Sequence, residues 1–300
     1  MTSFRLPQRV CPGIVAVSLV FIFFAGCNAA DKAALNVNQD LAAISSPNET
    51  KGEMWLIPST EPGFEMKTRV YKPTGDGPFR LAIINHGSAQ DPAQRKRVKP
   101  SEYAELTDWF LRRGYVVAFP ERPGHGSGGK YIEDQDGCDS ANFERAGQRT
   151  ADSIAAVLDY MRKQPFISPQ GTIVAGHSAG AWGSLAYAAR RPAGVIGVIN
   201  FSGGRGGRHL NRPNNNCAPE RLVATASRFG STTNIPTLWL YAENDTYFPP
   251  SLSGAMANAF KMAGGNAEYW LLPSTGNEGH FVIRSEAWKP AVQQFLDARG

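Results

Sequence analysis

The chain has 300 residues, of which 42% are hydrophobic and 19% are charged, and its formal net charge is +5. This length and apolar content suffice for one domain of roughly 250 residues with a sizeable core, and they exclude a disordered chain. No run of lysine and arginine interleaved with aromatic residues occurs, so the sequence predicts no nucleic-acid partner.

The first 27 residues have the pattern of an export signal. Two arginines precede an apolar run of twelve residues, which is the length of a signal-peptide core and too short to span a bilayer. The run ends at Phe24-Ala25-Gly26-Cys27 and resembles the lipobox of bacterial lipoproteins, in which the cysteine is lipidated. Phe24 replaces the aliphatic residue usual there, so cleavage after Ala29 or Ala30 is the alternative. We predict an exported protein that is lipid-anchored through Cys27, or otherwise periplasmic or secreted.

Residues 28–50 are small and polar, and they are predicted to form a flexible tether before a domain over 51–300. Removing residues 1–27 takes away two arginines and lowers the formal charge from +5 to +3, with 29 basic against 26 acidic residues. The remaining excess of three positive charges is too small to favour an acidic partner. The lipid on Cys27 is therefore the membrane contact that we expect, and the sequence leaves the oligomeric state open.

Strands and helices are predicted to alternate along the domain. Strands are expected where β-branched and aromatic residues cluster, and helices where apolar residues recur at helical spacing. The predicted strands cover 54–57, 64–71, 81–84, 116–119, 172–175, 195–199, 237–241 and 269–272. The predicted helices cover 101–113, the stretch around 154–161, 179–189, 252–263 and 286–298. Two opening strands followed by strand–helix units indicate the α/β class, with a mostly parallel sheet covered by helices on both faces.

Two long excursions interrupt this alternation, near 121–145 and 202–234, and we expect both to cover the site. Each contains one cysteine in a polar loop, Cys138 in the first and Cys217 in the second. In an exported chain, two loop cysteines favour a disulfide over two free thiols. Neither has metal-ligand spacing to a neighbouring Cys or His, so we predict no metal site.

A Gly-His-Ser-Ala-Gly motif over 176–180 lies between a predicted strand and a predicted helix. A serine at such a junction occupies a sharp turn, and the flanking glycines avoid a collision of a Cβ with the adjacent strand or helix. The turn lifts the hydroxyl above the sheet, and the first N–H groups of the helix point at any oxyanion formed beside it. The motif predicts Ser178 as a nucleophile.

A serine hydroxyl needs a neighbouring base, which is normally histidine. Of the five histidines, His280 follows the last predicted strand on a loop from which an imidazole can reach the serine, whereas His177 adjoins Ser178 and should point away. The imidazole in turn needs a carboxylate to fix its tautomer. Asp245 follows the preceding predicted strand at the same edge of the sheet and is predicted as that acid, with Glu243 as the fallback.

The chain order Ser178, Asp245, His280 is the order of the α/β-hydrolase superfamily. Residues 53–298 resemble this superfamily, and most of all its dienelactone-hydrolase-like and esterase-type members. The resemblance implies an α/β-hydrolase fold, with Ser178 as nucleophile, Asp245 as acid and His280 as base. True dienelactone hydrolases use a cysteine nucleophile. The activity implied here is therefore the hydrolysis of small carboxylic esters or thioesters, without a cofactor.

The resemblance also implies an oxyanion hole made by the backbone N–H groups of Ala179 and Ser88. Residues 122–127, with the sequence Arg-Pro-Gly-His-Gly-Ser, resemble the arginine- and glycine-rich loop common in the superfamily. We expect this loop to brace the site, with no direct role for His125.

Two further residues are candidates for substrate binding: His86, which precedes a glycine in the first loop, and Arg205, in the second excursion. For Arg205 the default expectation is instead that the arginines of that excursion are solvated or pair with the acidic residues of the first excursion, and recognition of a carboxylate or other anionic group on the substrate is the alternative. Two rival functions remain open. One is a peptidase of the same superfamily, and the other is an exported binding lipoprotein that keeps the fold without catalysis. The sequence leaves acyl and alcohol specificity open.

Overall fold

The computed structural model describes residues 52–99, 103–126 and 128–299. The predicted signal segment 1–27 with Cys27, and the predicted tether 28–50, lie outside the described residues, so both stay predictions. Within the described part, no helix is both long enough and apolar enough to cross a lipid bilayer.

The strands form one eight-stranded sheet. They are β1 (Glu53–Pro58), β2 (Glu65–Tyr71), β3 (Arg80–Asn85), β4 (Tyr115–Pro120), β5 (Thr172–His177), β6 (Val195–Phe201), β7 (Thr237–Ala242) and β8 (Ala267–Leu272). Their order in the sheet is β1-β2-β4-β3-β5-β6-β7-β8. The β1–β2 and β2–β4 pairs are antiparallel and the other neighbours are parallel. Every residue of β4, β5 and β7 is buried, which explains their continuous apolar sequences. The predicted mostly parallel sheet is confirmed.

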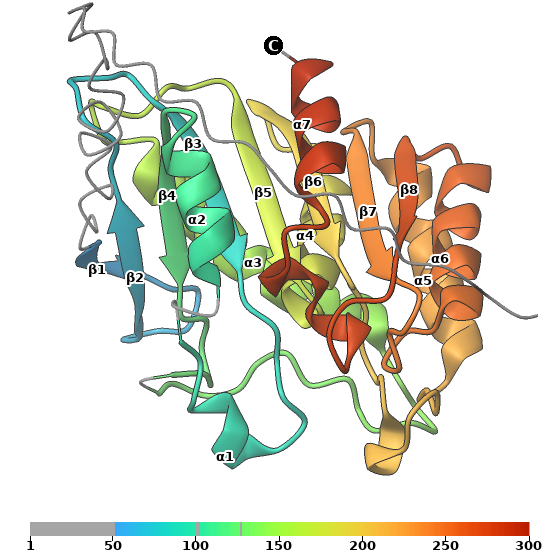
Figure 1. Ribbon diagram of the computed structural model, residues 1–300. Coiled ribbons are helices and arrows are strands. Elements are labelled where there is room, and N and C mark those ends of the chain that lie inside the picture. Colours follow the sequence, from blue (N-terminus) through green and yellow to red (C-terminus); the bar gives the residue numbers. More distant parts are fainter. Residues whose placement is uncertain (1–51, 100–102, 127, 300) are drawn as a thin grey trace, which may run out of the picture. The chain divides into compact units, whose positions relative to one another are not determined.

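Helices cover both faces of this sheet (Figure 1). They are α1 (Pro92–Arg95), α2 (Ala104–Leu111), α3 (Phe143–Met161), α4 (Ala179–Ala188), α5 (Pro219–Thr232), α6 (Pro250–Met262) and α7 (Lys289–Asp297), with 3-10 segments η2 (His209–Asn211) and η3 (Gly279–Arg284). One hydrophobic core joins one face of the sheet to α2, η3 and α7, and a second core joins the other face to α3, α4, α5 and α6. The sheet is therefore the middle of three layers.

The second excursion, which is predicted as a loop, contains the helix α5. Leu222, Ala226 and Phe229 of α5 are buried in the second core. Their spacing is helical, but the glycines and arginines over 203–212 dominate the composition of the excursion. The irregular part of the excursion is therefore the segment 202–218.

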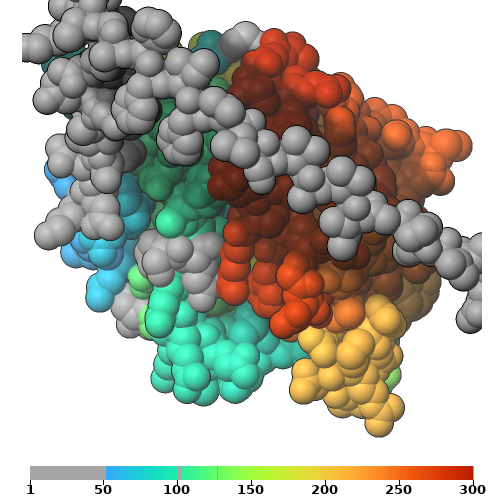
Figure 2. Space-filling view, viewed as in Figure 1, coloured from blue at the N-terminus to red at the C-terminus, as the bar shows by residue number. Residues whose placement is uncertain are grey.

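The loops that follow the parallel strands gather at one edge of the sheet (Figure 1). Figure 2 shows two projections at the lower edge of the view, one from the region of α1 and the other from the segment that leads into α5. The region of η3 is seen between and above them. The loops with the predicted functional residues therefore lie at this edge, where α/β sheets bind their ligands.

Candidate active site

Ser178 occupies a sharp turn between β5 and α4, which we call the elbow. Its φ of 53° and ψ of −121° lie in a region that a non-glycine residue adopts only where its surroundings impose it. A Cβ on Gly176 would lie 2.6 Å from the backbone nitrogen of Ala181, and one on Gly180 would overlap the carbonyl oxygen of Asn85. The turn therefore needs glycine at both positions, and it leaves Ser178 partly exposed.

Asp245 and His280 meet in the loops that follow β7 and β8. Asp245 Oδ2 lies 3.4 Å from His280 Nδ1, and the two residues are only 1% and 3% exposed. Asp245 Oδ1 accepts hydrogen bonds from the N–H groups of Tyr247 (2.8 Å) and Phe248 (2.9 Å), which fix the carboxylate. Glu243 is exposed and makes no described hydrogen bond to His280. Asp245 is therefore the carboxylate that faces the imidazole.

The His280 ring is covered by Tyr247, whose ring stacks on it at a centroid distance of 4.1 Å and an angle of 18°. On the elbow side, His177 Nε2–H donates a hydrogen bond of 2.9 Å to the carbonyl oxygen of His280. Tyr103 Oη lies 3.4 Å from the other ring nitrogen of His177. Burial and the neighbouring His280 hold the pKa of His177 well below its ordinary value. His177 is therefore a neutral support between the elbow and the loop of His280, and its described bonds go to residues other than Ser178.

Among the described residues, no hydrogen bond joins Ser178 Oγ to the His280 ring. The ring centroid of His177, which adjoins the serine, is 4.9 Å from that of His280, so the imidazole stands beside the elbow. In enzymes without substrate such bonds are often long and tighten when substrate binds. The structure thus brings Asp245 and His280 together beside the elbow, without a described hydrogen bond from Ser178 to the ring.

The two predicted oxyanion donors lie close to the elbow. Ala179 N–H begins α4 and Ser88 N–H lies in the loop after β3, and neither donates to a described acceptor. Gly87 packs against the elbow, because a Cβ on it would lie 3.3 Å from Ser178 Cβ. Its own N–H donates to Tyr103 Oη at 3.1 Å. Two unengaged N–H groups near a serine are what a developing oxyanion requires.

His86 is buried beneath this loop. Arg122 N–H donates to His86 Nε2 at 3.2 Å, so Nδ1 carries the proton and donates to the carbonyl oxygen of Gly87 at 2.7 Å. Burial, with Arg122 and His125 beside it, holds the pKa of His86 well below its ordinary value. In this structure the neutral imidazole shapes the loop that carries Ser88, and neither of its nitrogens is free for a ligand.

Arg205 is buried in an ion-pair cluster with Arg122 and Glu133. Glu133 Oε1 accepts from Arg122 Nε at 2.6 Å, and Glu133 Oε2 accepts from Arg205 Nη2 at 2.7 Å. Arg205 also donates to Thr150 Oγ1 at 2.9 Å. Burial would raise the pKa of Glu133, but the two guanidinium groups hold it well below its ordinary value. This geometry matches the default expectation that Arg205 pairs with the acidic first excursion.

His125 lies next to this cluster and holds the side chain of Ser88. Its Nδ1 is 3.2 Å from the carbonyl oxygen of Pro123, so Nδ1 carries the proton, and Ser88 Oγ–H donates to Nε2 at 2.9 Å. Burial lowers the pKa of His125 to about 4, with Glu133 opposing the shift and the two arginines adding to it. The arginine- and glycine-rich loop therefore braces Ser88.

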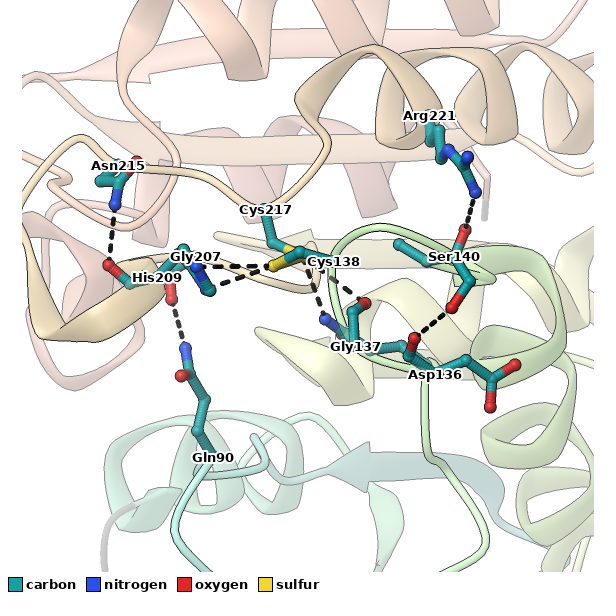
Figure 3. The surroundings of a disulfide bond; sticks show 12 residues. Gln90, Asp136, Gly137, Cys138, Ser140, Gly207, His209, Asn215, Cys217 and Arg221 are labelled. Carbon is teal, nitrogen blue, oxygen red and sulfur yellow. Dashed lines mark hydrogen bonds between the residues drawn. A yellow bond between two sulfur atoms is a disulfide. The ribbon is translucent and has the colours of Figure 1, made fainter.

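The predicted disulfide between Cys138 and Cys217 is present and joins the two excursions (Figure 3). Gln90 Nε2 donates to the carbonyl oxygen of Gly207 at 2.6 Å, which ties the loop after β3 to the second excursion. His209 Nδ1 lies 3.2 Å from Cys138 Sγ. Three potential metal-ligating atoms, one each from Cys138, His209 and Cys217, thus lie within 4.8 Å of one another, but the disulfide removes both thiolates that would bind a metal ion.

Sequence reasoning missed Glu278, which contacts both functional loops. Its Oε1 accepts from the N–H groups of Thr246 (3.0 Å) and His280 (3.1 Å). Its Oε2 lies 3.3 Å from Arg208 Nη1. The position of Glu278 two residues before His280 is visible in the sequence. The contact with Thr246, 32 residues away, cannot be seen without the fold.

The chain resembles known proteins over much of its length. Residues 101–195, which include Ser178, match the prolyl oligopeptidase family. None of the curated proteins compared with the chain matches it. Among solved structures, a dienelactone hydrolase-like protein from Klebsiella pneumoniae is 18% identical, with a TM-score of 0.57, over 82% of this chain and 96% of that one. An esterase from Pyrococcus furiosus is 16% identical, with a TM-score of 0.59, over 83% and 93%.

A puromycin-hydrolysing peptidase from Mycobacterium tuberculosis is 17% identical, with a TM-score of 0.56, over 80% of this chain and 38% of that one. At these identities the likeness concerns the fold and not the substrate. The strand order, the elbow between β5 and α4 and the structural neighbours agree with one another. The protein therefore has the α/β-hydrolase fold, as its resemblance to that superfamily implies.

Proposed function

We propose that the protein is a serine hydrolase that cleaves carboxylic esters or thioesters through an acyl-enzyme. The observation that carries the proposal is the contact of 3.4 Å between Asp245 and His280 beside the elbow that presents Ser178. A nucleophile, a base with its carboxylate and two unengaged N–H groups are the parts that acyl transfer requires. The reaction calls for no cofactor.

In the proposed reaction, His280 Nε2 takes the proton of Ser178 Oγ as the oxygen attacks the carbonyl carbon of the ester. Asp245 keeps the proton on His280 Nδ1 and stabilises the imidazolium. The N–H groups of Ala179 and Ser88 donate to the oxyanion, and removing one such donor typically costs about 3 kcal/mol of transition-state stabilisation. The imidazolium then protonates the leaving alcohol or thiol, and water repeats the sequence to release the acid.

A fluorophosphonate probe tests this proposal. It should label the wild-type protein and spare Ser178→Ala, which should also lose hydrolysis of a p-nitrophenyl ester by at least about 1,000-fold. Equal labelling of both proteins would refute the assignment of Ser178. A folded wild-type protein that is neither labelled nor active would favour the non-catalytic binding lipoprotein. A panel of short- and long-chain acyl esters would then define the acyl preference.

The match of residues 101–195 to the prolyl oligopeptidase family favours peptide hydrolysis as a second candidate function. Two substrates with the same acyl group, one a p-nitrophenyl ester and the other a p-nitroanilide, separate the two. An esterase should show a far higher kcat/KM for the ester. A kcat/KM for the anilide that exceeds the one for the ester would favour the peptidase.

We further propose that the protein is exported and lipid-anchored at Cys27. The disulfide between Cys138 and Cys217 supports export, because disulfides persist in oxidising compartments. Growth with a labelled fatty acid should label the wild-type chain and not Cys27→Ala. A mature wild-type chain without label would reject lipidation and favour plain signal cleavage.

A further inference from the structure

Glu278 lies between the loops that carry Asp245 and His280. Its Oε1 accepts hydrogen bonds from Thr246 N–H at 3.0 Å and from His280 N–H at 3.1 Å. Its Oε2 accepts from the hydroxyl of Thr246. One carboxylate therefore binds the backbone of His280 itself and that of the residue next to Asp245.

These two loops follow different strands, β7 and β8, so their relative position depends on contacts between them. One other contact is the hydrogen bond of 3.1 Å from Gly279 N–H to the carbonyl oxygen of Asn244. The side chain of Asn244 also exchanges hydrogen bonds with the backbone of Thr275 and donates one to the carbonyl oxygen of Gly276. The bonds of Glu278 act on His280 and Thr246 directly, and a shift of either loop would lengthen them.

Arg208 reaches Glu278 from the second excursion. Its Nη1 lies 3.3 Å from Glu278 Oε2, and its guanidinium lies 5.2 Å from the ring centroid of Tyr247. Tyr247 in turn stacks on His280. Both residues of the ion pair are largely covered, with side-chain exposures of 25% for Arg208 and 17% for Glu278. Arg208 thus orients the carboxylate from the side of the disulfide-linked excursions.

We propose that Glu278 is a positioning residue that holds Asp245 and His280 in the arrangement needed for catalysis, and that Arg208 orients its carboxylate. This inference deepens the proposed serine-hydrolase function and rests on it. Glu278→Ala should lower kcat by about 10- to 100-fold with little change in KM, because small misplacements of reacting groups have effects of this size. Glu278→Gln keeps one oxygen acceptor for the two N–H groups and should recover part of the loss. Arg208→Gln should cause a smaller loss than Glu278→Ala.

The experiment measures kcat and KM per active site, with the sites counted by fluorophosphonate titration. Glu286→Gln is the matched control, because Glu286 is an exposed glutamate that follows the same loop and pairs with Lys289 at 3.0 Å. The control should keep the wild-type kcat and KM. The inference is overturned if Glu278→Ala keeps the wild-type kcat per titrated site, even with a lowered melting temperature, because its role would then be structural alone.

A second readout needs no turnover. The proton on His280 Nδ1, held by Asp245, should give a downfield proton resonance in the NMR spectrum of the wild-type protein. This resonance should shift or broaden in Glu278→Ala and return toward its wild-type position in Glu278→Gln. An unchanged resonance in Glu278→Ala would overturn the inference whether or not the protein hydrolyses esters. Failure of the wild-type protein to react with the probe would instead refute the proposed function.

Discussion

Asp245 and Glu243 are two carboxylates of one loop in different surroundings. Asp245 is buried and contacts His280 at 3.4 Å, whereas Glu243 is exposed to solvent. Asp245→Asn keeps the shape of the side chain but cannot hold the right imidazole tautomer, so kcat should fall by about 1,000- to 10,000-fold. Glu243→Gln should stay close to wild type. Steady-state kinetics with one ester substrate checks both, and a larger loss in Glu243→Gln would exchange the roles of the two residues.

His125 makes stability depend on pH. Its folded-state pKa of about 4 lies below the ordinary value near 6.5, so the unfolded chain binds more protons between these two values. Stability should therefore fall as the pH drops from about 6.5 to about 4, by up to about 3 kcal/mol from this residue. His86 and His177, whose pKa values are also lowered, act in the same direction.

Urea unfolding at a series of pH values between 4 and 8 checks this expectation. In His125→Gln, the free energy of unfolding should depend less steeply on pH, because one of the three imidazoles with a lowered pKa is gone. A variant with the wild-type dependence would show that His125 binds a proton equally well in the folded and unfolded chains.

At the scale of elements, the cluster of Arg122, Glu133 and Arg205 joins segments that are distant in the sequence. Arg122 and Glu133 are fully buried, and Arg205 is nearly so. Glu133→Gln would leave two buried guanidinium groups without their counter-charge, and it should lower the free energy of unfolding by about 3–5 kcal/mol.

Glu144→Gln provides the control for this prediction. Glu144 forms an ion pair with Arg228 in which both side chains are about half exposed. Such pairs contribute about 0–1 kcal/mol, so this variant should unfold close to wild type. Denaturant unfolding of both variants gives the comparison. Equal losses in the free energy of unfolding would contradict the expectation that the buried ion pair contributes more than the exposed one.

The predicted elements agree with the structure where local pattern dominates. The apolar runs of β4, β5 and β7 identify them as buried strands, because their neighbours on both faces are helices. The pattern fails for α5, in which Leu222 and Phe229 have helical spacing but follow a stretch rich in glycine and arginine. Its helical state is stabilised by burial against the core, which composition alone does not reveal.

The candidate site likewise combines features that the sequence predicts with contacts that it does not. The placement of Ser178, Asp245 and His280 at one edge of the sheet can be predicted, because the ends of parallel strands meet there. The pairing of Glu133 with Arg122 and the contacts of Glu278 cannot be predicted, since both glutamates lie on segments whose positions depend on tertiary packing. Contacts between residues that are far apart in the sequence are not visible in it, and only the fold shows which charged groups are buried and must therefore be paired.

At the scale of the whole molecule, the disulfide links residues that are 79 positions apart. Such a link limits the freedom of the unfolded chain, so replacing both Cys138 and Cys217 by serine should lower the free energy of unfolding by about 2–4 kcal/mol. Urea unfolding of the oxidised wild type and of the double variant measures the difference. A dithiol reductant should destabilise the wild type and leave the variant unchanged, and the same stability in all these forms would contradict the prediction.

The same bond has a consequence for proteolysis. The segment that it closes, 138–217, includes β5, the elbow and β6, so Ser178 lies inside a covalent ring. A protease that cuts the irregular loop between 202 and 216 would open the backbone but leave the two fragments attached. The nicked chain would run as one band on a non-reducing gel and as two bands after reduction.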